Sequence, residues 1–172
     1  MAARPPLEQL LPEFRAYARS LCGQSEVAED LVQDAVERAL KSGSTPELPE
    51  SLRPWMFRVI RNLHYDELRK LRIRREYLAR EKRQSDERGD LDDRTRDALI
   101  RLHYERLPPD KREVLFLVDI MGLKYAEASE VMGVATGTVM SRLSRARQAL
   151  RARIDAGEDS PATGSRSGTR NG

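Results

Sequence analysis

The segment Gly137-Thr-Val-Met-Ser-Arg-Leu-Ser-Arg-Ala-Arg-Gln-Ala-Leu150 decides the fold of the second half of the chain. At about 100° per residue along a helix, four of its apolar side chains lie within about 60° of one another and predict a buried stripe. These four are Val139, Leu143, Ala146 and Leu150. The other sides carry small hydroxyls and arginines, which can contact base edges and phosphates in a DNA major groove. The candidate DNA-binding residues are Ser141, Arg142, Ser144, Arg145 and Arg147.

Two shorter segments upstream complete a helix-turn-helix pattern. An apolar helical stripe ends at Gly122, and a second short helix, predicted over about Tyr125 to Met132, ends at Gly133. Glycine is favoured just past a helix end because it adopts the left-handed backbone conformation without strain. Helix, glycine turn, short helix, turn and longer helix is the order of helix-turn-helix DNA-binding modules. The alternative from this pattern alone is a three-helix bundle whose last helix simply faces solvent.

The composition favours small helical units over one large core. Of the 172 residues, 39% are hydrophobic, 5% aromatic and 34% charged, and that charged share exceeds the ~25% typical of soluble domains. No stretch approaches the ~20 apolar residues of a membrane span, and the first residues lack the apolar segment of a signal peptide. A single cysteine, Cys22, excludes an internal disulfide and a cysteine-based zinc cluster. We therefore expect a soluble, cytoplasmic chain with no membrane insertion, no metal and no cofactor.

Three more amphipathic helices are predicted in the first half of the chain. Apolar residues at helical spacing from Leu7 to Leu21 predict the first, and the second runs from about Ser25 to Lys41. The stretch from Ser42 to Pro54 holds three prolines and is predicted as a loop. A third helix is predicted to begin near Pro54, because proline suits the first turn of a helix. One face of the second helix carries an acidic and amide stripe, formed by Asp30, Gln33, Asp34 and Glu37.

Charge divides the chain into acidic and basic blocks. Residues 1–50 carry 5 basic and 9 acidic side chains, whereas residues 51–83 carry 11 basic and 4 acidic ones. This asymmetry indicates that different faces bind different partners, and that the basic block binds a polyanion. The alternative is that the charged side chains simply form solvated helix surfaces. The predicted fold is all-α, with two small helical domains joined by a charged linker. The predicted boundaries are 1–75 for the first domain, 76–104 for the linker, 105–155 for the helix-turn-helix domain and 156–172 for a disordered tail.

Several segments resemble the extracytoplasmic-function (ECF) sigma factors of bacterial RNA polymerase. The stretch Leu107-Pro-Pro-Asp-Lys-Arg-Glu-Val-Leu-Phe-Leu-Val-Asp-Ile-Met-Gly-Leu-Lys-Tyr125 resembles the opening of the family's −35-binding domain, and residues 137–150 resemble its recognition helix. Ala28-Glu-Asp-Leu-Val-Gln-Asp-Ala-Val-Glu-Arg-Ala39 resembles the helix that binds core polymerase. Pro54-Trp-Met-Phe-Arg-Val-Ile-Arg-Asn-Leu-His-Tyr-Asp-Glu-Leu-Arg-Lys70 resembles the −10 helix. These motifs occur in the family's order and spacing.

The resemblance implies a sigma factor that binds core RNA polymerase and directs promoter-specific initiation at −35 and −10 elements. The stripe from Asp30 to Glu37 would then dock on the clamp helices of the largest polymerase subunit, where carboxylates and amides can pair with arginine-rich surfaces. The recognition helix would read the −35 element of promoter DNA, and an anti-sigma factor would mask both functional faces. The implied −10 contacts are Arg58, Arg61, Asn62, Asp66, Arg69 and Lys70.

Two places depart from the family's pattern. The loop from Lys41 to Arg53, which in the family captures a melted base, is rich in proline and glutamate and lacks an aromatic residue, and Trp55 is predicted in the core. The other departure is Ala128-Ser129, where the family usually has isoleucine and alanine. Removing an isoleucine-sized side chain from a core costs about 2–5 kcal/mol. We therefore expect weaker packing of the second domain, offset where Met121 and Met132 fill the space.

Three other classes of protein compete with a sigma factor as explanations of the sequence. An enzyme is not expected, because the sequence has no glycine-rich phosphate loop, no His-x-x-x-His pair and no Ser/His/Asp set in a plausible context. A helix-turn-helix transcription regulator that binds duplex DNA on its own remains the alternative function, and such proteins usually bind spaced half-sites as dimers. A purely protein-binding adaptor would not need arginines on a recognition helix.

Overall fold

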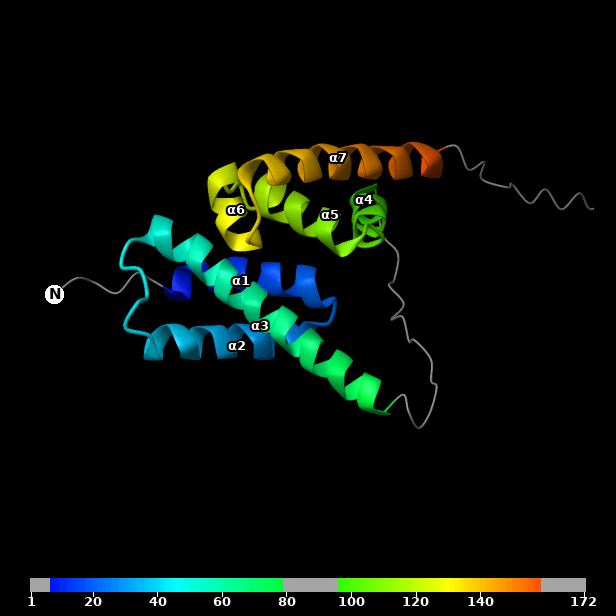
Figure 1. Ribbon diagram of the computed structural model, residues 1–172. Helices are drawn as coiled ribbons and strands as arrows, with labels where there is room; N and C mark the ends of the chain where they lie inside the picture. The colour runs from blue at the N-terminus through cyan, green and yellow to red at the C-terminus, as the bar shows by residue number, and fades with distance from the viewer. Residues whose placement is uncertain (1–6, 79–95, 159–172) are drawn as a thin grey trace, which may run out of the picture.

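The computed structural model describes residues 7–78 and 96–158, and all regular structure within these ranges is helical. The all-α prediction is therefore confirmed. The helices form two units, α1 to α3 and α4 to α7, which lie against each other (Figure 1). Their bounds are α1 Leu7–Cys22, α2 Ser25–Lys41, α3 Pro49–Leu78, α4 Arg96–Glu105, α5 Pro109–Leu115, the π-helical turn η1 Phe116–Ile120, α6 Tyr125–Met132 and α7 Thr136–Glu158.

An aromatic cluster forms the centre of the first unit. The rings of Phe14 and Phe57 meet edge to face with centroids 5.8 Å apart, and Tyr17 meets Phe57 at 4.9 Å. All three side chains are fully buried. Edge-to-face pairs add about 0.5–1.5 kcal/mol beyond the burial of their area. This cluster fixes α3 on α1, and small residues of α2 such as Ala28 and Ala35 complete the core.

Helix α3 begins earlier than the sequence predicts. The predicted loop from Ser42 to Pro54 is shorter in the structure, because α3 starts at Pro49 and contains Pro54 within it. Pro49 is itself a favourable first-turn residue. The backbone N–H of Leu52 donates to the Leu48 carbonyl at 2.8 Å, and the Leu52 side chain is fully buried. Burial of Leu52 thus favours the extra helical turn. The sequence did not predict this turn because the prolines in the stretch indicated a loop.

The second unit has the predicted helix-turn-helix order. Gly122 and Gly133 adopt the left-handed conformation, with φ of 70° and 65°, and they end the two short helical segments as predicted. Val139, Leu143 and Ala146 of α7 are buried, and Leu150 packs partly buried beside them. The predicted buried side of α7 is therefore confirmed.

Helix α4 occupies the end of the segment 76–104 that was predicted as the linker and extends one residue beyond it. It contacts α7, so the ordered part of the second unit begins before residue 105. Its Tyr104 hydroxyl donates to the Arg112 carbonyl at 3.0 Å, which attaches α4 to α5. Residues 79–95 of the predicted linker lie outside the described residues, as does the predicted tail from residue 159 onward, whereas residues 156–158 belong to α7.

The two units pack against each other through a continuous apolar cluster. Helix α1 contacts α5 and η1, and α3 contacts α6. The Tyr17 ring lies 5.8 Å from that of Phe116, and both belong to the buried cluster that extends through both units. The sequence left open whether the two domains associate in the free chain; the structure shows them associated. No described helix combines the length and apolar character needed to cross a lipid bilayer.

Candidate polymerase and nucleic-acid interfaces

The outward face of α7 presents the predicted −35 residues. Ser141, Ser144 and Arg145 are exposed, and the contacts of Arg145 stay within its own helix. Its Nε donates to the Ser141 carbonyl and its Nη2 to Ser141 Oγ, both at 3.2 Å. Arg142 is half-buried, whereas Arg147 is exposed and pairs with Asp119 at 2.6 Å. The hydrogen bonds of Arg145 are thus to Ser141 of its own helix, and no other described helix binds its guanidinium. This leaves the side chain available to contact DNA.

The turn before α7 is fixed by short-range hydrogen bonds. Ser129 Oγ donates to the Val134 carbonyl at 2.7 Å, across the turn at Gly133. At the start of α6, the Lys124 backbone N–H donates to the Glu127 carboxylate at 2.8 Å. The serine that departs from the family's pattern therefore has a polar partner in the turn. Its neighbour Ala128 is fully buried.

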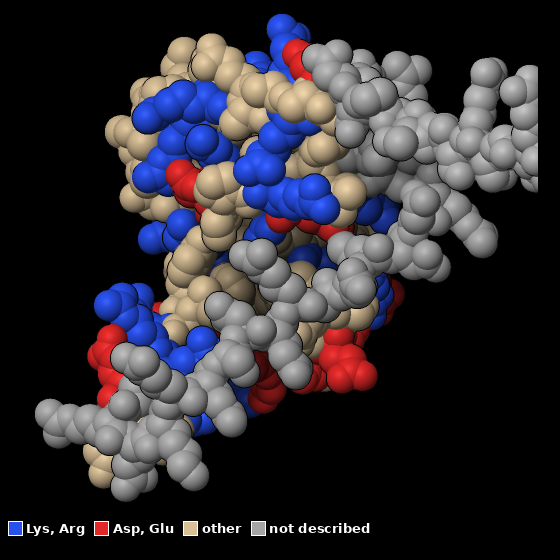
Figure 2. Space-filling view, turned by 90° about the vertical axis from the view of Figure 1, so that its right-hand side faces the viewer, with Lys and Arg blue, Asp and Glu red and all other residues tan. Residues whose placement is uncertain are grey.

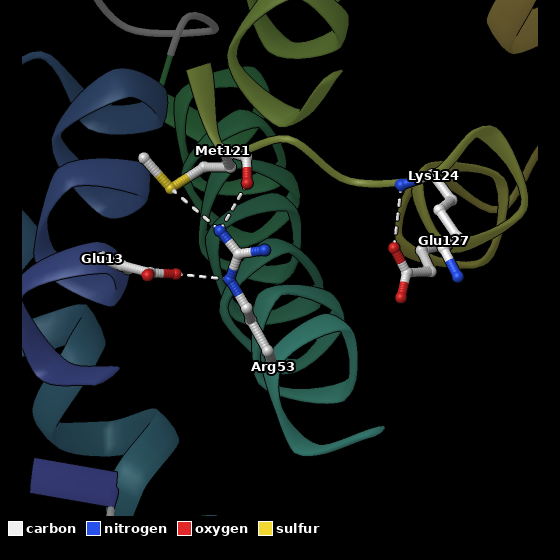
Figure 3. A network of polar contacts seen from close by, with 5 residues as sticks. All are labelled: Glu13, Arg53, Met121, Lys124 and Glu127. Atoms are coloured by element: carbon white, nitrogen blue, oxygen red, sulfur yellow. Dashed lines mark hydrogen bonds and ion pairs between the residues drawn. The ribbon is translucent and has the colours of Figure 1, made fainter. Parts of the chain in front are cut away.

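Met121 and Met132, which were expected to fill the space beside Ala128, lie in different environments. Met132 is buried in the same apolar cluster as Ala128. Met121 is half-buried at the junction with α3, where its carbonyl accepts a hydrogen bond from Arg53 (Figure 3). Of the two, Met132 is thus a buried core residue, while Met121 contributes to the contact between the units.

Helix α3 carries most of the predicted −10 residues on one exposed side. Arg58, Asn62, Arg69 and Lys70 are exposed, and Asp66 is half-buried. Arg69 pairs with Asp66 at 3.1 Å, and Lys70 pairs with Glu67 at 2.8 Å. Exposed pairs one helical turn apart are worth only tenths of a kcal/mol, so these basic groups can exchange partners readily.

Arg61 is placed apart from the other predicted −10 residues. Its Nε donates to Glu113 Oε1 on α5 at 2.8 Å, and only 20% of its side chain is exposed. Burial opposes the charge of the guanidinium, but the Glu113 carboxylate outweighs that effect and the pKa of Arg61 is raised. In this arrangement Arg61 joins the two units instead of facing solvent.

Sequence reasoning missed Glu113, the one charged side chain described as buried, at 1% exposure. Its carboxylate also accepts a hydrogen bond from the Tyr17 hydroxyl at 2.8 Å. Burial, followed by the charge of Glu113, raises the pKa of Tyr17 well above its usual value, so the phenol remains a donor. The available signal was the position of Glu113 one turn before the core residue Leu117, which places a carboxylate on the buried face.

The predicted polymerase-binding stripe is exposed along α2. Asp30, Gln33, Asp34 and Glu37 all face solvent. Glu37 pairs with Lys41 one turn later, and this hydrogen bond lowers the pKa of the Glu37 carboxyl. The other three make no side-chain hydrogen bond within the described part of the chain. Their availability matches a surface that binds a basic partner.

Basic side chains also gather on the end of the molecule at which α7 finishes. In Figure 2, lysine and arginine cover much of the upper half, which is the α4–α7 unit. Acidic side chains are more prominent in the lower half, formed by α1 to α3. A basic surface of this kind attracts the phosphates of nucleic acids.

Cys22 and His64 lie together between α1 and α3. Cys22 Sγ is 3.6 Å from His64 Nδ1, and burial raises the pKa of the thiol. Burial, and then the charges of Arg112 and Arg61, lower the pKa of His64.

Within residues 7–78 and 96–158, no group of three or more side chains has the composition of a metal site. Trp55, which the sequence predicted in the core, is half-buried and packs against it.

Comparisons with known proteins place both units in one family. Residues 7–74 match the family model for Sigma-70 region 2, and residues 93–150 match that for Sigma-70, region 4. The ECF RNA polymerase sigma factor EcfG of Rhodopseudomonas palustris (strain TIE-1) is 36% identical over 156 residues, covering 87% of this chain and 84% of the relative.

Solved structures agree with this assignment. The sigma factor RpoE in complex with the anti-sigma factor NepR from Bartonella quintana superposes with a TM-score of 0.68 at 29% identity, covering 87% of this chain and 94% of that one. CnrH in complex with the cytosolic domain of CnrY gives 0.60 at 28% identity, covering 87% and 85%. With both sigma regions matched in order and an ECF relative 36% identical over most of its length, the chain belongs to the ECF family of RNA polymerase sigma factors.

Proposed function

We propose that the three exposed helical faces divide the work of a sigma subunit. The α2 stripe from Asp30 to Glu37 docks on the clamp helices of the largest subunit of core RNA polymerase. The basic side of α3 holds the −10 element, and Ser141, Ser144 and Arg145 of α7 read the −35 element. The observation that carries this division is the simultaneous exposure of the three faces on a chain of this family. The chain itself performs no catalysis, which belongs to the polymerase, and it acts in the cytoplasm with promoter DNA.

An anti-sigma factor is proposed as the partner that controls this activity. The related RpoE and CnrH are both recorded in complexes, the first with an anti-sigma factor and the second with the cytosolic domain of CnrY. Two small units that expose separate binding faces offer a single inhibitor the opportunity to cover both. Deletion of the gene for such a partner should raise transcription from the promoters that this chain serves, and unchanged transcription would contradict the proposal.

The direct test is to mix the full chain with bacterial core RNA polymerase and analyse the mixture by size-exclusion chromatography. We expect co-elution that is lost in the Asp30→Ala/Asp34→Ala variant. A Glu8→Ala/Glu130→Ala variant removes two exposed acids from α1 and α6 and is the matched control for charge. Circular dichroism confirms that both variants are folded. Separation of the wild-type chain from polymerase, together with tight duplex binding by the chain alone, would instead favour an independent helix-turn-helix regulator.

A further inference from the structure

A buried carboxylate joins the two units of the chain. Glu113 of α5 accepts hydrogen bonds from Tyr17 of α1 and from Arg61 of α3, each at 2.8 Å. A second nitrogen of Arg61 lies 3.5 Å from the other carboxylate oxygen. Residues far apart in the sequence, from three helices, thus complete one polar cluster inside a largely apolar junction.

A second arginine of α3 lies in the same junction. Arg53 is two turns before Arg61 on α3, and it pairs with Glu13 of α1 while donating to the Met121 carbonyl of the other unit (Figure 3). Phe57 is midway between the two arginines and is fully buried. One side of α3 therefore faces the second unit, with an arginine at each end of the contact.

The energetics of such a cluster suit a contact that opens and closes. A buried ion pair loses hydration when it forms, so its net contribution is small even though removing one partner alone is strongly unfavourable. When the units separate, Glu113, Tyr17 and Arg61 all regain water. The cluster of Glu113, Tyr17 and Arg61 therefore forms only when the two units are closed, and its small net free energy still allows the units to separate.

We propose that Glu113 is a latch that holds the two units closed in the free chain and keeps Arg61 away from DNA. Opening of the junction releases Arg61 to the same basic side of α3 that carries Arg58 and Asn62. Association with polymerase and promoter then competes with the latch, so the free chain binds DNA more weakly than an opened one. The DNA part of this inference rests on the proposed function of α3. The closed arrangement does not, because it is seen in the contacts of Glu113 and Arg53 and in the apolar cluster shared by the units.

The test measures opening and DNA binding separately on the full chain. Two dyes are attached at exposed positions of α1 and α7 through Glu8→Cys and Asp155→Cys in a Cys22→Ser background, and energy transfer reports the separation of the units. Glu113→Gln keeps the shape of the side chain but removes its charge. Tyr17→Phe removes only the hydroxyl that donates to Glu113 and keeps the aromatic packing. Glu29→Gln is the matched control, because Glu29 pairs with Arg15 at 2.9 Å within the first unit.

We expect lower energy transfer in Glu113→Gln, a smaller change in the same direction in Tyr17→Phe, and no change in Glu29→Gln. Affinity for a fluorescent single-stranded DNA, measured by anisotropy, should rise by the factor by which the open fraction rises. Unchanged transfer in both Glu113→Gln and Tyr17→Phe, with circular dichroism showing folded chains, would overturn the latch. Lower transfer with unchanged DNA affinity would uphold the latch and overturn the role of Arg61. Neither the transfer measurement nor its outcome depends on polymerase binding.

Discussion

Replacement of Arg145 by alanine should reduce promoter recognition without destabilising the fold. In the structure both hydrogen bonds of Arg145 are to Ser141 of the same helix, at 3.2 Å, and the side chain is exposed. The change should therefore alter the free energy of unfolding by no more than about 0.5 kcal/mol. An arginine that reads a base contributes about 1–3 kcal/mol of discrimination. That energy corresponds to a loss of about 5- to 150-fold in affinity for the −35 element.

The assay compares holoenzyme binding to a duplex that carries the −35 element with binding to a scrambled duplex of the same length. The control is Arg153→Ala, which removes an exposed arginine eight residues further along α7. We expect Arg145→Ala to lose selectivity, and Arg153→Ala to weaken both duplexes alike if it has any effect. Equal losses on both duplexes for Arg145→Ala would show that Arg145 contacts only the phosphates. A lowered melting temperature of the Arg145→Ala variant would show that Arg145 also stabilises the fold, and would refute the reasoning that its loss affects DNA binding only.

Three further perturbations test the core, the half-buried His64 and the α2 stripe. Phe57→Ala should lower the free energy of unfolding by about 3–5 kcal/mol in urea titration, because the ring is fully buried against Phe14 and Tyr17; a loss below about 1 kcal/mol would contradict this packing. Because the pKa of His64 is lowered in the folded chain, the unfolded chain binds more protons below about pH 6.5, so stability falls as the pH drops. His64→Gln should show a shallower decline there, and identical slopes would exclude this group as a cause. Asp34→Ala should weaken binding to core polymerase, measured by titration of labelled chain, and leave DNA binding by the α7 face unchanged; equal loss of both would indicate misfolding.

Local patterns in the sequence were sufficient to predict most of the second unit. The positions of Gly122 and Gly133, together with the spacing of Val139 and Leu143, correctly predicted the ends of the short helices and the buried side of α7. These features depend on residues that are close in sequence, so their physical cause is visible without the fold. The start of α3 was predicted too late because Pro49 and Pro54 both suit a first turn. Only the burial of Leu52 decides between them.

The junction between the units could not be predicted in the same way. Glu113 lies 96 residues from Tyr17 and 52 from Arg61, so no local periodicity connects them. Arg61 was grouped with the −10 residues on the family resemblance, and its sequence neighbours do not reveal an acidic partner in the other unit. Only packing of the complete chain brings these charges together.

The shared interior also bears on how such chains are inherited. Each half matches its own family model, yet the ring of Tyr17 from the first half lies against Phe116 from the second. A half transferred to another gene would carry an uncovered aromatic face with it. Exposed apolar faces of this kind promote association with unrelated proteins. Because of the contact between Tyr17 and Phe116, recombination that separates the two halves is expected to be selected against. The two halves are therefore expected to be inherited as one unit.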